Sequence, residues 1–569
     1  MFGEAGSAED YITDAEQHNP WWSTSALTAA DFDGVTEYSP RSDFFALLGD
    51  FEDSAIDSNA NIHAIYGQTG IGKTTLIRQF IAGLIDETHF DWSPESRSQE
   101  LVQSVSPRQI LYIPLEESLY NLDAPEDAIL ALETVLDYFR SHIARPAEQR
   151  FIFLDDIGAL RLDDSLESRF LEIFEPGSVV LVAGHTESQV DFSSSRPVES
   201  VEVSNKIFPM LTMKFIDTIK KGIYDEIDDV PLSIESGLSS RIRGYQTPKD
   251  TDIPPLIKRA RGKLKAREMD GFLESLEQLY FEELTDSDRQ TLQQAAEVYL
   301  RHGGILYRTD ETIVRNELVK SRFLLYLYKE LAHIERVQEP ANLHRLSSIA
   351  ATQAGEELQY TELANQIGVD RRTIDSYLET LEAGKAVSEA SEYSIRQHRR
   401  TRLYLRNPRH LVTLSQKQEH FGFETFGSPG QLNHEFQYKL AKSVIYDHAR
   451  RLAWQMPRGP TEPGTVEYET TDSGVVDYIL EGDGLVVPFA LSYHPHTAEA
   501  EQAVLEFDPS NGNHSDEAGD TADLDYACPV RFVLTDSFPR ELEDKGTFLS
   551  EADGEAVHYL PYWLFLLIS

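Results

Sequence analysis

The chain has 569 residues, with 51 Lys and Arg against 96 Asp and Glu, so its formal net charge is −45 at pH 7. This length predicts several domains, and a hydrophobic content of 41% is enough for packed cores, which excludes a disordered polyelectrolyte. The single cysteine, Cys528, excludes a disulfide framework and a Cys-rich zinc site. No signal-peptide pattern opens the sequence, and no apolar run reaches the roughly 20 residues that span a bilayer. We therefore expect a cytoplasmic protein that makes no membrane contact.

The acidic residues are spread over the whole chain instead of being gathered in one tail. This distribution resembles the proteins of salt-in halophiles, whose carboxylate-rich surfaces suit molar salt and repel themselves in dilute buffer. An ordinary acidic protein is the alternative. Because binding to nucleic acid weakens as salt rises, such a chain cannot depend on a broad basic face. A local group of arginines is therefore more informative here than in a neutral protein.

Patterns of hydrophobic residues divide the chain into five regions. Residues 1–55 form an acidic, irregular N-terminal segment, and residues 56–205 alternate apolar strand-like runs with helical patterns, which predicts a parallel α/β core. Helical periodicity dominates residues 206–335, a helix-turn-helix pattern occupies residues 336–410, and residues 411–569 return to mixed strands and helices. Within the α/β core we expect strands at residues 62–66, 109–115, 151–154 and 179–183, and helices at residues 73–86 and 125–143.

A phosphate-binding motif, GxxxxGK[ST], lies between the first predicted strand of this core and the helix that follows it. Glycines let successive backbone N–H groups point at phosphate oxygens, and the helix adds its positive N-terminal end. Lys73 would reach the β and γ phosphates, and Thr74 would supply a hydroxyl to Mg²⁺. The alternative is a Gly-rich turn without a ligand. The predicted nucleotide-binding residues are Gly67, Gln68, Thr69, Gly70, Ile71, Gly72, Lys73, Thr74 and Thr75.

Two carboxylates follow the apolar run at residues 151–154, where the carboxyl end of a buried strand would deliver them to the crevice above the sheet. We predict that Asp155 binds Mg²⁺ together with Thr74, and that Asp156 acts with Lys73 in catalysis by polarising the attacking water. A strand that ends in a polar turn is the alternative. After the next strand, His185 or Thr186 is placed to sense the γ-phosphate. Arg241 and Arg243 are candidates for an arginine finger.

Together with these motifs, several downstream blocks resemble a prokaryotic, especially archaeal, group of AAA-type ATPases. The resemblance rests on the segments GQTGIGKTT, FIFLDDIG, LVAGHTES, AEVYLRHGG, YTELANQIGVDRRTIDSYLETLEAG, VVDYIL and VPFALSY. It implies a P-loop ATPase core that binds ATP and Mg²⁺, a helical region, a winged helix and a C-terminal nuclease-like α/β domain. The family usually has Asp-Glu where this chain has Asp155-Asp156. The shorter side chain withdraws the carboxylate by about 1.5 Å, and we expect slow hydrolysis because misplacement on that scale can cost about 100-fold in rate.

The winged-helix region contains most of the arginines that could contact DNA. A helix is expected to start near Asp370, with an apolar stripe that faces the protein interior. Its first residues would face outward, where they could enter the major groove of DNA. We predict that six arginines contact DNA phosphates: Arg371, Arg372, Arg396, Arg399, Arg400 and Arg402. Arg406 and Arg409 belong to the same arginine-rich segment. The alternative is that this region packs on the rest of the protein and its arginines pair with carboxylates.

The C-terminal region resembles a restriction-endonuclease-like core that has lost part of its site. Glu435 on a helix and Asp477 on a strand match the expected metal-binding positions, but Ala490 and Ser492 stand where Glu-x-Lys is required. We therefore expect an inactive domain. His494 and His496 could form a metal-binding pair, and the alternative is two exposed histidines without a ligand.

Three functions fit these observations. The favoured hypothesis is an ATP-dependent switch that acts on DNA or on a protein partner, with an oligomer possible. A nucleotide-bound scaffold that does not hydrolyse ATP is the second, and a replication-initiator-like DNA-binding ATPase is the third.

Overall fold

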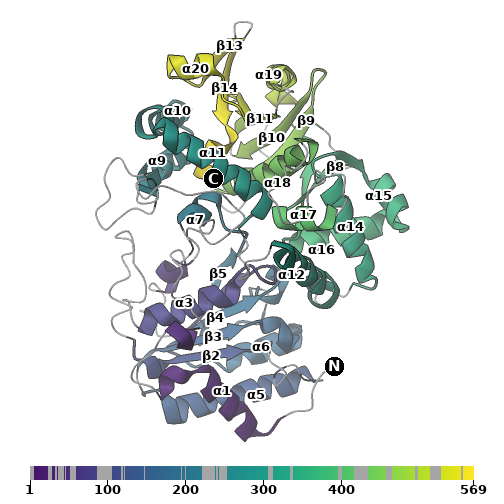
Figure 1. The fold of residues 1–569 in the computed structure, drawn as a ribbon. Coiled ribbons are helices and arrows are strands. Elements are labelled where there is room, and N and C mark those ends of the chain that lie inside the picture. Colours follow the sequence, from purple (N-terminus) through teal and green to yellow (C-terminus); the bar gives the residue numbers. More distant parts are fainter. Residues whose placement is uncertain are drawn as a thin grey trace. The chain divides into compact units, whose positions relative to one another are not determined.

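A computed structural model describes most of the chain (Figure 1). The chain divides into two compact units. The first unit comprises Met1–Leu211, Leu324–Pro340 and Ala383–Lys385, and the second comprises Thr212–Phe323, Ala341–Glu382 and Ala386–Ser569. The described residues are 6–23, 29–32, 35, 41, 44, 47–51, 59–85, 105–116, 120, 122, 124–146, 148–193, 195–198, 200–220, 238, 241–242, 253–304, 312–332, 337–394, 400–415, 434–456, 464–482, 484–493, 497–512, 527–552 and 555–569.

The first unit is built on a five-stranded parallel sheet with the order β2-β3-β4-β1-β5. Each strand from β1 to β4 is a nearly continuous apolar run, as expected for a sheet covered on both faces. Strand β4 lies between β1, which precedes the phosphate-binding motif, and β3, which leads to the paired aspartates. The strands are β1 (Ala60–Tyr66), β2 (Ile110–Pro114), β3 (Arg150–Asp155), β4 (Ser178–Gly184) and β5 (Val201–Pro209).

The helices of the first unit confirm the alternation expected from the sequence, and with it the predicted α/β fold class. They are α1 (Ala8–His18), α3 (Lys73–Ile85), α5 (Pro125–Tyr138), which continues as the π-helical turn η6 (Phe139–Ile143), and α6 (Asp164–Glu172). The expectation of an irregular N-terminal segment is wrong for α1, which begins with a capping box at Ser7. The indole N–H groups of Trp21 and Trp22 both donate to the carbonyl oxygen of Ile110, which fixes this segment to the edge strand β2.

Helices dominate the part of the second unit that comes first in the sequence. They are α7 (Phe215–Lys220), α9 (Ile253–Lys265), α10 (Met269–Glu277) with the π-helical turn η10 (Gln278–Glu283), and α11 (Asp286–His302). Helix α12 (Thr312–Leu325) then leads into the π-helical turn η11 (Tyr326–Leu331), which belongs to the first unit.

The next region combines helices with three short strands. It contains α14 (Pro340–Thr352), β6 (Glu357–Gln359), α15 (Tyr360–Ile367), α16 (Arg371–Ala383), β7 (Val387–Ser391) and β8 (Arg400–Leu405), and α17 (Pro408–Ser415) follows. The strands pair antiparallel in the order β6-β8-β7. Gly368 ends α15 in the left-handed conformation, as a helix C-terminus favours. The inward stripe predicted on α16 is confirmed, because Ile374, Tyr377, Leu378 and Leu381 are buried.

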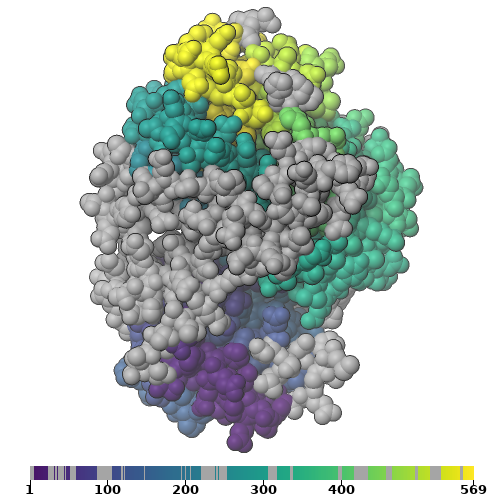
Figure 2. All heavy atoms as spheres, in the orientation of Figure 1, coloured from purple at the N-terminus to yellow at the C-terminus, as the bar shows by residue number. Residues whose placement is uncertain are grey.

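A six-stranded sheet with the order β13-β14-β12-β11-β10-β9 forms the C-terminal part. Strands β11, β12 and β14 are parallel to one another, and the other pairs are antiparallel. The elements are α18 (His434–Ala453), β9 (Thr465–Thr470), β10 (Val475–Gly482), β11 (Leu485–Ser492), α19 (Thr497–Glu506), β12 (Phe532–Thr535), α20 (Arg540–Lys545), β13 (Leu549–Ala552), β14 (Glu555–Pro561) and α21 (Tyr562–Ile568). The exposed residues of α20 lie on the surface, in yellow in Figure 2.

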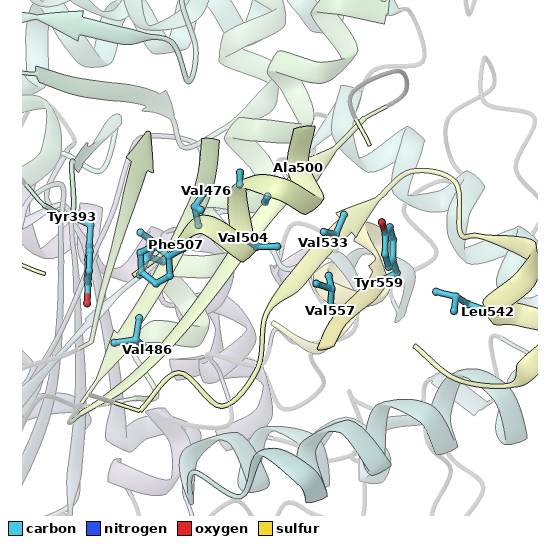
Figure 3. Close-up of a cluster of buried hydrophobic side chains, with 13 residues drawn as sticks. Tyr393, Val476, Val486, Ala500, Val504, Phe507, Val533, Leu542, Val557 and Tyr559 are labelled. Atoms are coloured by element: carbon cyan, nitrogen blue, oxygen red, sulfur yellow. The ribbon is translucent and has the colours of Figure 1, made fainter. Parts of the chain in front are cut away.

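Helices α19 and α21 cover opposite faces of this sheet. Ala503 and Val504 of α19 pack with Ala490 of β11 in the buried cluster of Figure 3. The neighbouring Phe489 points the other way, because side chains alternate along a strand, and its ring lies 5.2 Å from that of Phe565 in α21. None of the described helices combines the length and the apolarity needed to cross a membrane.

Candidate nucleotide-binding site

The phosphate-binding motif forms a tight loop between β1 and α3. Gly70 and Gly72 have φ angles of 81° and 102°, a backbone region that other residues rarely adopt. A Cβ atom at Gly67 would lie 2.5 Å from the carbonyl oxygen of Met210, so this position also requires glycine. The loop therefore needs its glycines for conformation and close packing.

Lys73 lies buried at the start of α3, and its ammonium group turns into the loop. The Nζ atom donates to the carbonyl oxygens of Gly67, at 2.7 Å, and Gln68, at 3.2 Å, and lies 3.4 Å from Nδ1 of His185. Burial lowers the pKa of Lys73, although nearby carboxylates, with Asp156 first among them, oppose this shift.

Asp155 ends β3 and lies next to Thr74. Its carboxylate accepts a hydrogen bond from the Tyr112 hydroxyl at 3.2 Å. Burial raises the pKa of Asp155 and outweighs the opposing effects of the Thr74 hydrogen bond and the Lys73 charge. A cavity of about 390 Å³ opens here, lined by Thr74, Arg78, Tyr112, Pro114, Glu116 and Asp155.

Asp156 follows in the left-handed conformation, with φ 60° and ψ 62°. Its carboxylate lies 3.1 Å from Nε2 of His185 at the end of β4. Burial alone would raise the pKa of Asp156, but the charge and hydrogen bond of His185, together with Lys73, hold it below the usual value. Of the two candidate phosphate sensors, His185 faces the loop, whereas the Thr186 hydroxyl contacts Ser188.

Two contacts come from parts of the first unit that are far away in sequence. The Thr69 hydroxyl donates to the carboxylate of Glu330 in η11, and this carboxylate lies 3.5 Å from Nδ1 of His185. The Gln68 side-chain amide donates to the carbonyl oxygen of Lys385. The side chain of Glu330 is 16% exposed. A partly buried carboxylate thus contacts the loop that is expected to bind phosphate.

The structure brings together most of the predicted site residues and adds others. Lys73, Asp156 and His185 converge on one point, while Ile71 faces inward and Thr75 is exposed. Sequence reasoning missed Arg78, Tyr112, Glu116 and Glu330. Glu116 could have been found, because it follows the carboxyl end of β2 as the aspartates follow β3. No local pattern marks Glu330.

This arrangement fits a magnesium nucleotide. The glycine loop and the N-terminus of α3 offer backbone N–H groups to phosphate, and the neighbouring oxygens of Thr74 and Asp155 are hard ligands suited to Mg²⁺. Within the described ranges, no group of three or more His, Cys, Asp or Glu side chains could hold a metal ion by itself. Mg²⁺ here would therefore also use phosphate and water oxygens, and when bound it would neutralise phosphate charge.

The prediction that Arg402 contacts DNA is wrong. Arg402 is 4% exposed, and its guanidinium lies 3.5 Å from the carboxylate of Asp477. Arg406 and Arg409 are buried as well, and Arg406 pairs with Asp447 at 3.0 Å. Carboxylates therefore pair Arg402 and Arg406 inside the protein, which was the alternative interpretation.

The other arginine candidates differ in their surroundings. Arg371 and Arg372 are exposed at the start of α16, and the Arg371 guanidinium lies over the ring of Tyr360. Arg400 pairs with Glu357 at 3.0 Å. Arg241, a candidate arginine finger, pairs with Asp288 at 3.3 Å. Arg243, Arg396, Arg399, His494 and His496 lie outside the described residues.

Basic side chains surround Asp477, where the sequence resemblance implied a metal-binding position. The Asp477 carboxylate lies 3.3 Å from Nζ of Lys442, close to Arg402, and accepts a hydrogen bond from the backbone N–H of Leu491 at 2.9 Å. Ala490 and Ser492 are buried. Glu435 is exposed and pairs with Lys439 at 3.7 Å. That this domain is inactive stays a prediction.

The first unit combines a five-stranded parallel sheet, a glycine-rich loop after β1 and carboxylates after β3. This is the arrangement that the sequence resemblance to AAA-type ATPases implies for the P-loop core.

Comparisons with known proteins identify no family for the whole chain. One family model matches residues 297–415 and is described as a domain of unknown function (DUF8612). No curated protein matches. Similar solved structures include Orc1 from Aeropyrum pernix in complex with DNA, at 13% identity over 66% of this chain and 92% of that chain, with a TM-score of 0.24. Cdc6p from Pyrobaculum aerophilum has 14% identity over 70% and 97% of the two chains, with a TM-score of 0.22. Drosophila ORC bound to DNA has 11% identity over 73% and 95%, with a TM-score of 0.23.

Proposed function

We propose that this protein is an ATP-dependent switch, in which ATP and Mg²⁺ bind at the P-loop and change the position of the chain segments that contact it. The observation that carries this proposal is the Glu330 carboxylate on the phosphate loop, hydrogen bonded to Thr69 and close to His185. ATP would bind through residues 67–75, and Mg²⁺ through Thr74 and Asp155.

Electrostatics give the switch its driving force. The site already holds the carboxylates of Asp155, Asp156, Glu116 and Glu330 around the ammonium of Lys73. Two unit charges 4 Å apart repel by about 4 kcal/mol at an effective dielectric constant of 20. A triphosphate in the loop would therefore repel Glu330, and Mg²⁺ would offset the charge of the remaining carboxylates. Nucleotide binding should expel Glu330 from the loop.

The covalent chain offers a route from the loop to the winged-helix region. Gln68 contacts the backbone of Lys385, and Val387 begins strand β7 only two residues later. Likewise, η11 follows directly after α12. A nucleotide that displaces Glu330 and rearranges Gln68 would act on both ends of the segment that contains helices α14, α15 and α16 of this region.

The partner that fits best is a protein. Arg402 and Arg406, which could have formed a basic wing, are buried in ion pairs, and the chain carries a net charge of −45. DNA binding as in a replication initiator is the second candidate, because Arg371 and Arg372 are exposed at the start of α16. Titration of labelled duplex DNA against wild type and an Arg371→Ala, Arg372→Ala variant separates the two: DNA affinity that the variant loses would favour the initiator.

Hydrolysis depends on Asp156. Its carboxylate contacts His185, which also lies near Lys73, so the three side chains form one network at the expected position of the terminal phosphate. We expect slow turnover because aspartate is one methylene shorter than the glutamate usual in the family. A scaffold that retains ATP without turnover would show binding but no phosphate release.

The test combines binding with local exchange. We expect Mg²⁺-dependent ATP binding that Lys73→Ala abolishes, and faster hydrogen exchange with ATP in residues 324–332 and 383–385. The matched control is Lys263→Ala, which alters an exposed lysine of α9 paired with Glu268. Loss of ATP binding in both variants, or unchanged exchange in these segments with ATP bound, would contradict the proposal.

A further inference from the structure

A second polar cavity lies wholly within the second unit, where the parallel strands of the six-stranded sheet end. Its volume is about 550 Å³. Three of its lining residues, Tyr493, Asp536 and Tyr562, each come directly after the carboxyl end of a strand, namely β11, β12 and β14. Ligands of open α/β sheets bind outside the carboxyl ends of parallel strands, so the topology puts this cavity where a binding site is expected.

The floor of the cavity is buried and incompletely hydrogen bonded. Tyr562 is 1% exposed, and its hydroxyl has no hydrogen-bond partner among the described residues. A buried hydroxyl without a partner is costly, so such a group within a cavity indicates that something else supplies the hydrogen bond. Tyr493 is also buried, and its ring lies 6.5 Å from that of Tyr562. The floor therefore offers aromatic surface together with a free hydrogen-bonding group.

Charged groups of both signs border the same cavity. Helix α11 contributes Glu297 and Arg301, Asp536 follows β12, and His434 begins α18 with its ring 5.1 Å from that of Tyr493. Glu297 and Arg301 are one helical turn apart and attract each other electrostatically, but neither forms a close ion pair with any residue that the structure describes. Both can therefore bind a ligand without first breaking an ion pair.

The charges and the hydrogen-bonding groups of the cavity favour one class of ligand over others. Two carboxylates disfavour an anion such as a nucleic-acid phosphate, and the described residues contain no cluster that could hold a metal ion. A lone organic cation would leave Arg301 without a counterpart. A molecule with an ammonium group, a carboxylate and a hydrogen-bonding tail matches all of these groups.

We propose that this cavity binds a free amino acid with a polar side chain. Its α-carboxylate contacts Arg301, its α-ammonium contacts Glu297 and Asp536, and its side chain reaches the Tyr562 hydroxyl between the rings of the floor. The cavity thus serves as a small-molecule site in the nuclease-like domain, independent of the P-loop.

The experiment measures thermal unfolding of the full chain with each of the twenty L-amino acids, because a ligand of the folded state raises the unfolding temperature. We expect at least one polar amino acid to raise it, and its N-acetyl and carboxamide derivatives, which each lack one charge, to have no effect. If no amino acid raises it, or if either derivative binds as well as the parent, the proposal is wrong.

Two variants make the test specific to the cavity. Arg301→Gln and Tyr562→Phe should each weaken binding roughly tenfold or more, since each removes a hydrogen-bonding group. Tyr468→Phe is the matched control, because its hydroxyl is also buried without a described partner but does not line the cavity. Tyr562→Phe removes no described hydrogen bond and should fold normally. Equal affinities in Tyr562→Phe and Tyr468→Phe would overturn the proposal.

Discussion

Substitution of Glu330 by glutamine tests whether this carboxylate competes with nucleotide. Glutamine keeps the size of the side chain and its ability to accept the Thr69 hydrogen bond, but it removes the negative charge. Hydrogen bonds to charged groups contribute about 1.5–3 kcal/mol, and those between neutral groups about 0.5–1.5 kcal/mol. The exchange should therefore weaken the contact by about 1–1.5 kcal/mol.

If ATP must break the contact between Thr69 and Glu330 in order to bind, a weaker contact makes the free energy of ATP binding more favourable by the same amount. Glu330→Gln should bind ATP with Mg²⁺ roughly tenfold more tightly than wild type, since about 1.4 kcal/mol corresponds to a factor of ten in Kd. Removal of charge repulsion acts in the same direction. The effect should be larger for ATP than for ADP if Glu330 lies near the γ-phosphate.

Isothermal titration calorimetry in KCl-containing buffer measures both affinities. Glu126→Gln is the control, because Glu126 is an exposed residue in the first turn of α5 and its loss changes the net charge equally. An unchanged or weaker ATP affinity in Glu330→Gln would refute the reasoning, and so would an equal gain in Glu126→Gln, because a general charge effect would then explain both.

Three further predictions concern catalysis, acid stability and salt. Asp156→Glu should raise phosphate release in a single-turnover assay because the longer side chain advances the carboxylate, and an unchanged rate would argue that its length is not limiting. Burial lowers the pKa of His410 to about 3 from an ordinary 6.5, so the neutral ring stabilises the fold fully above pH 6.5 and this contribution is lost as pH falls toward 3. Denaturant unfolding at pH 8 and pH 5 should therefore show a loss of stability that is about 2 kcal/mol smaller in His410→Leu than in wild type, and equal losses would contradict this. The unfolding temperature of wild type should rise with KCl because a net charge of −45 repels itself, whereas no rise would count against halophilic adaptation.

Local sequence determined the P-loop and the strands around it. Glycines at 67, 70 and 72, followed by Lys73, specify a loop whose backbone conformation few other residues adopt. Apolar runs predicted β1 to β4 because a strand buried on both faces must be apolar along its length. Strand β5, from Val201 to Pro209, escaped prediction because polar residues interrupt it. In the C-terminal sheet, β13 and β14 were not predicted either.

Only the tertiary structure decided which distant groups meet. Glu330 reaches Thr69 across 261 positions of sequence, and Arg402 reaches Asp477 across 75. The sequence shows that these residues are charged, but not whether each charge contacts solvent, DNA or another part of the protein. The chain topology determines this: it places Tyr493, Asp536 and Tyr562 together at the carboxyl ends of parallel strands, and it buries several of the arginines predicted to contact DNA. The physical reason is that hydrophobic periodicity and backbone conformation act between near neighbours, whereas ion pairs and cavities arise between residues that only folding brings within a few ångströms.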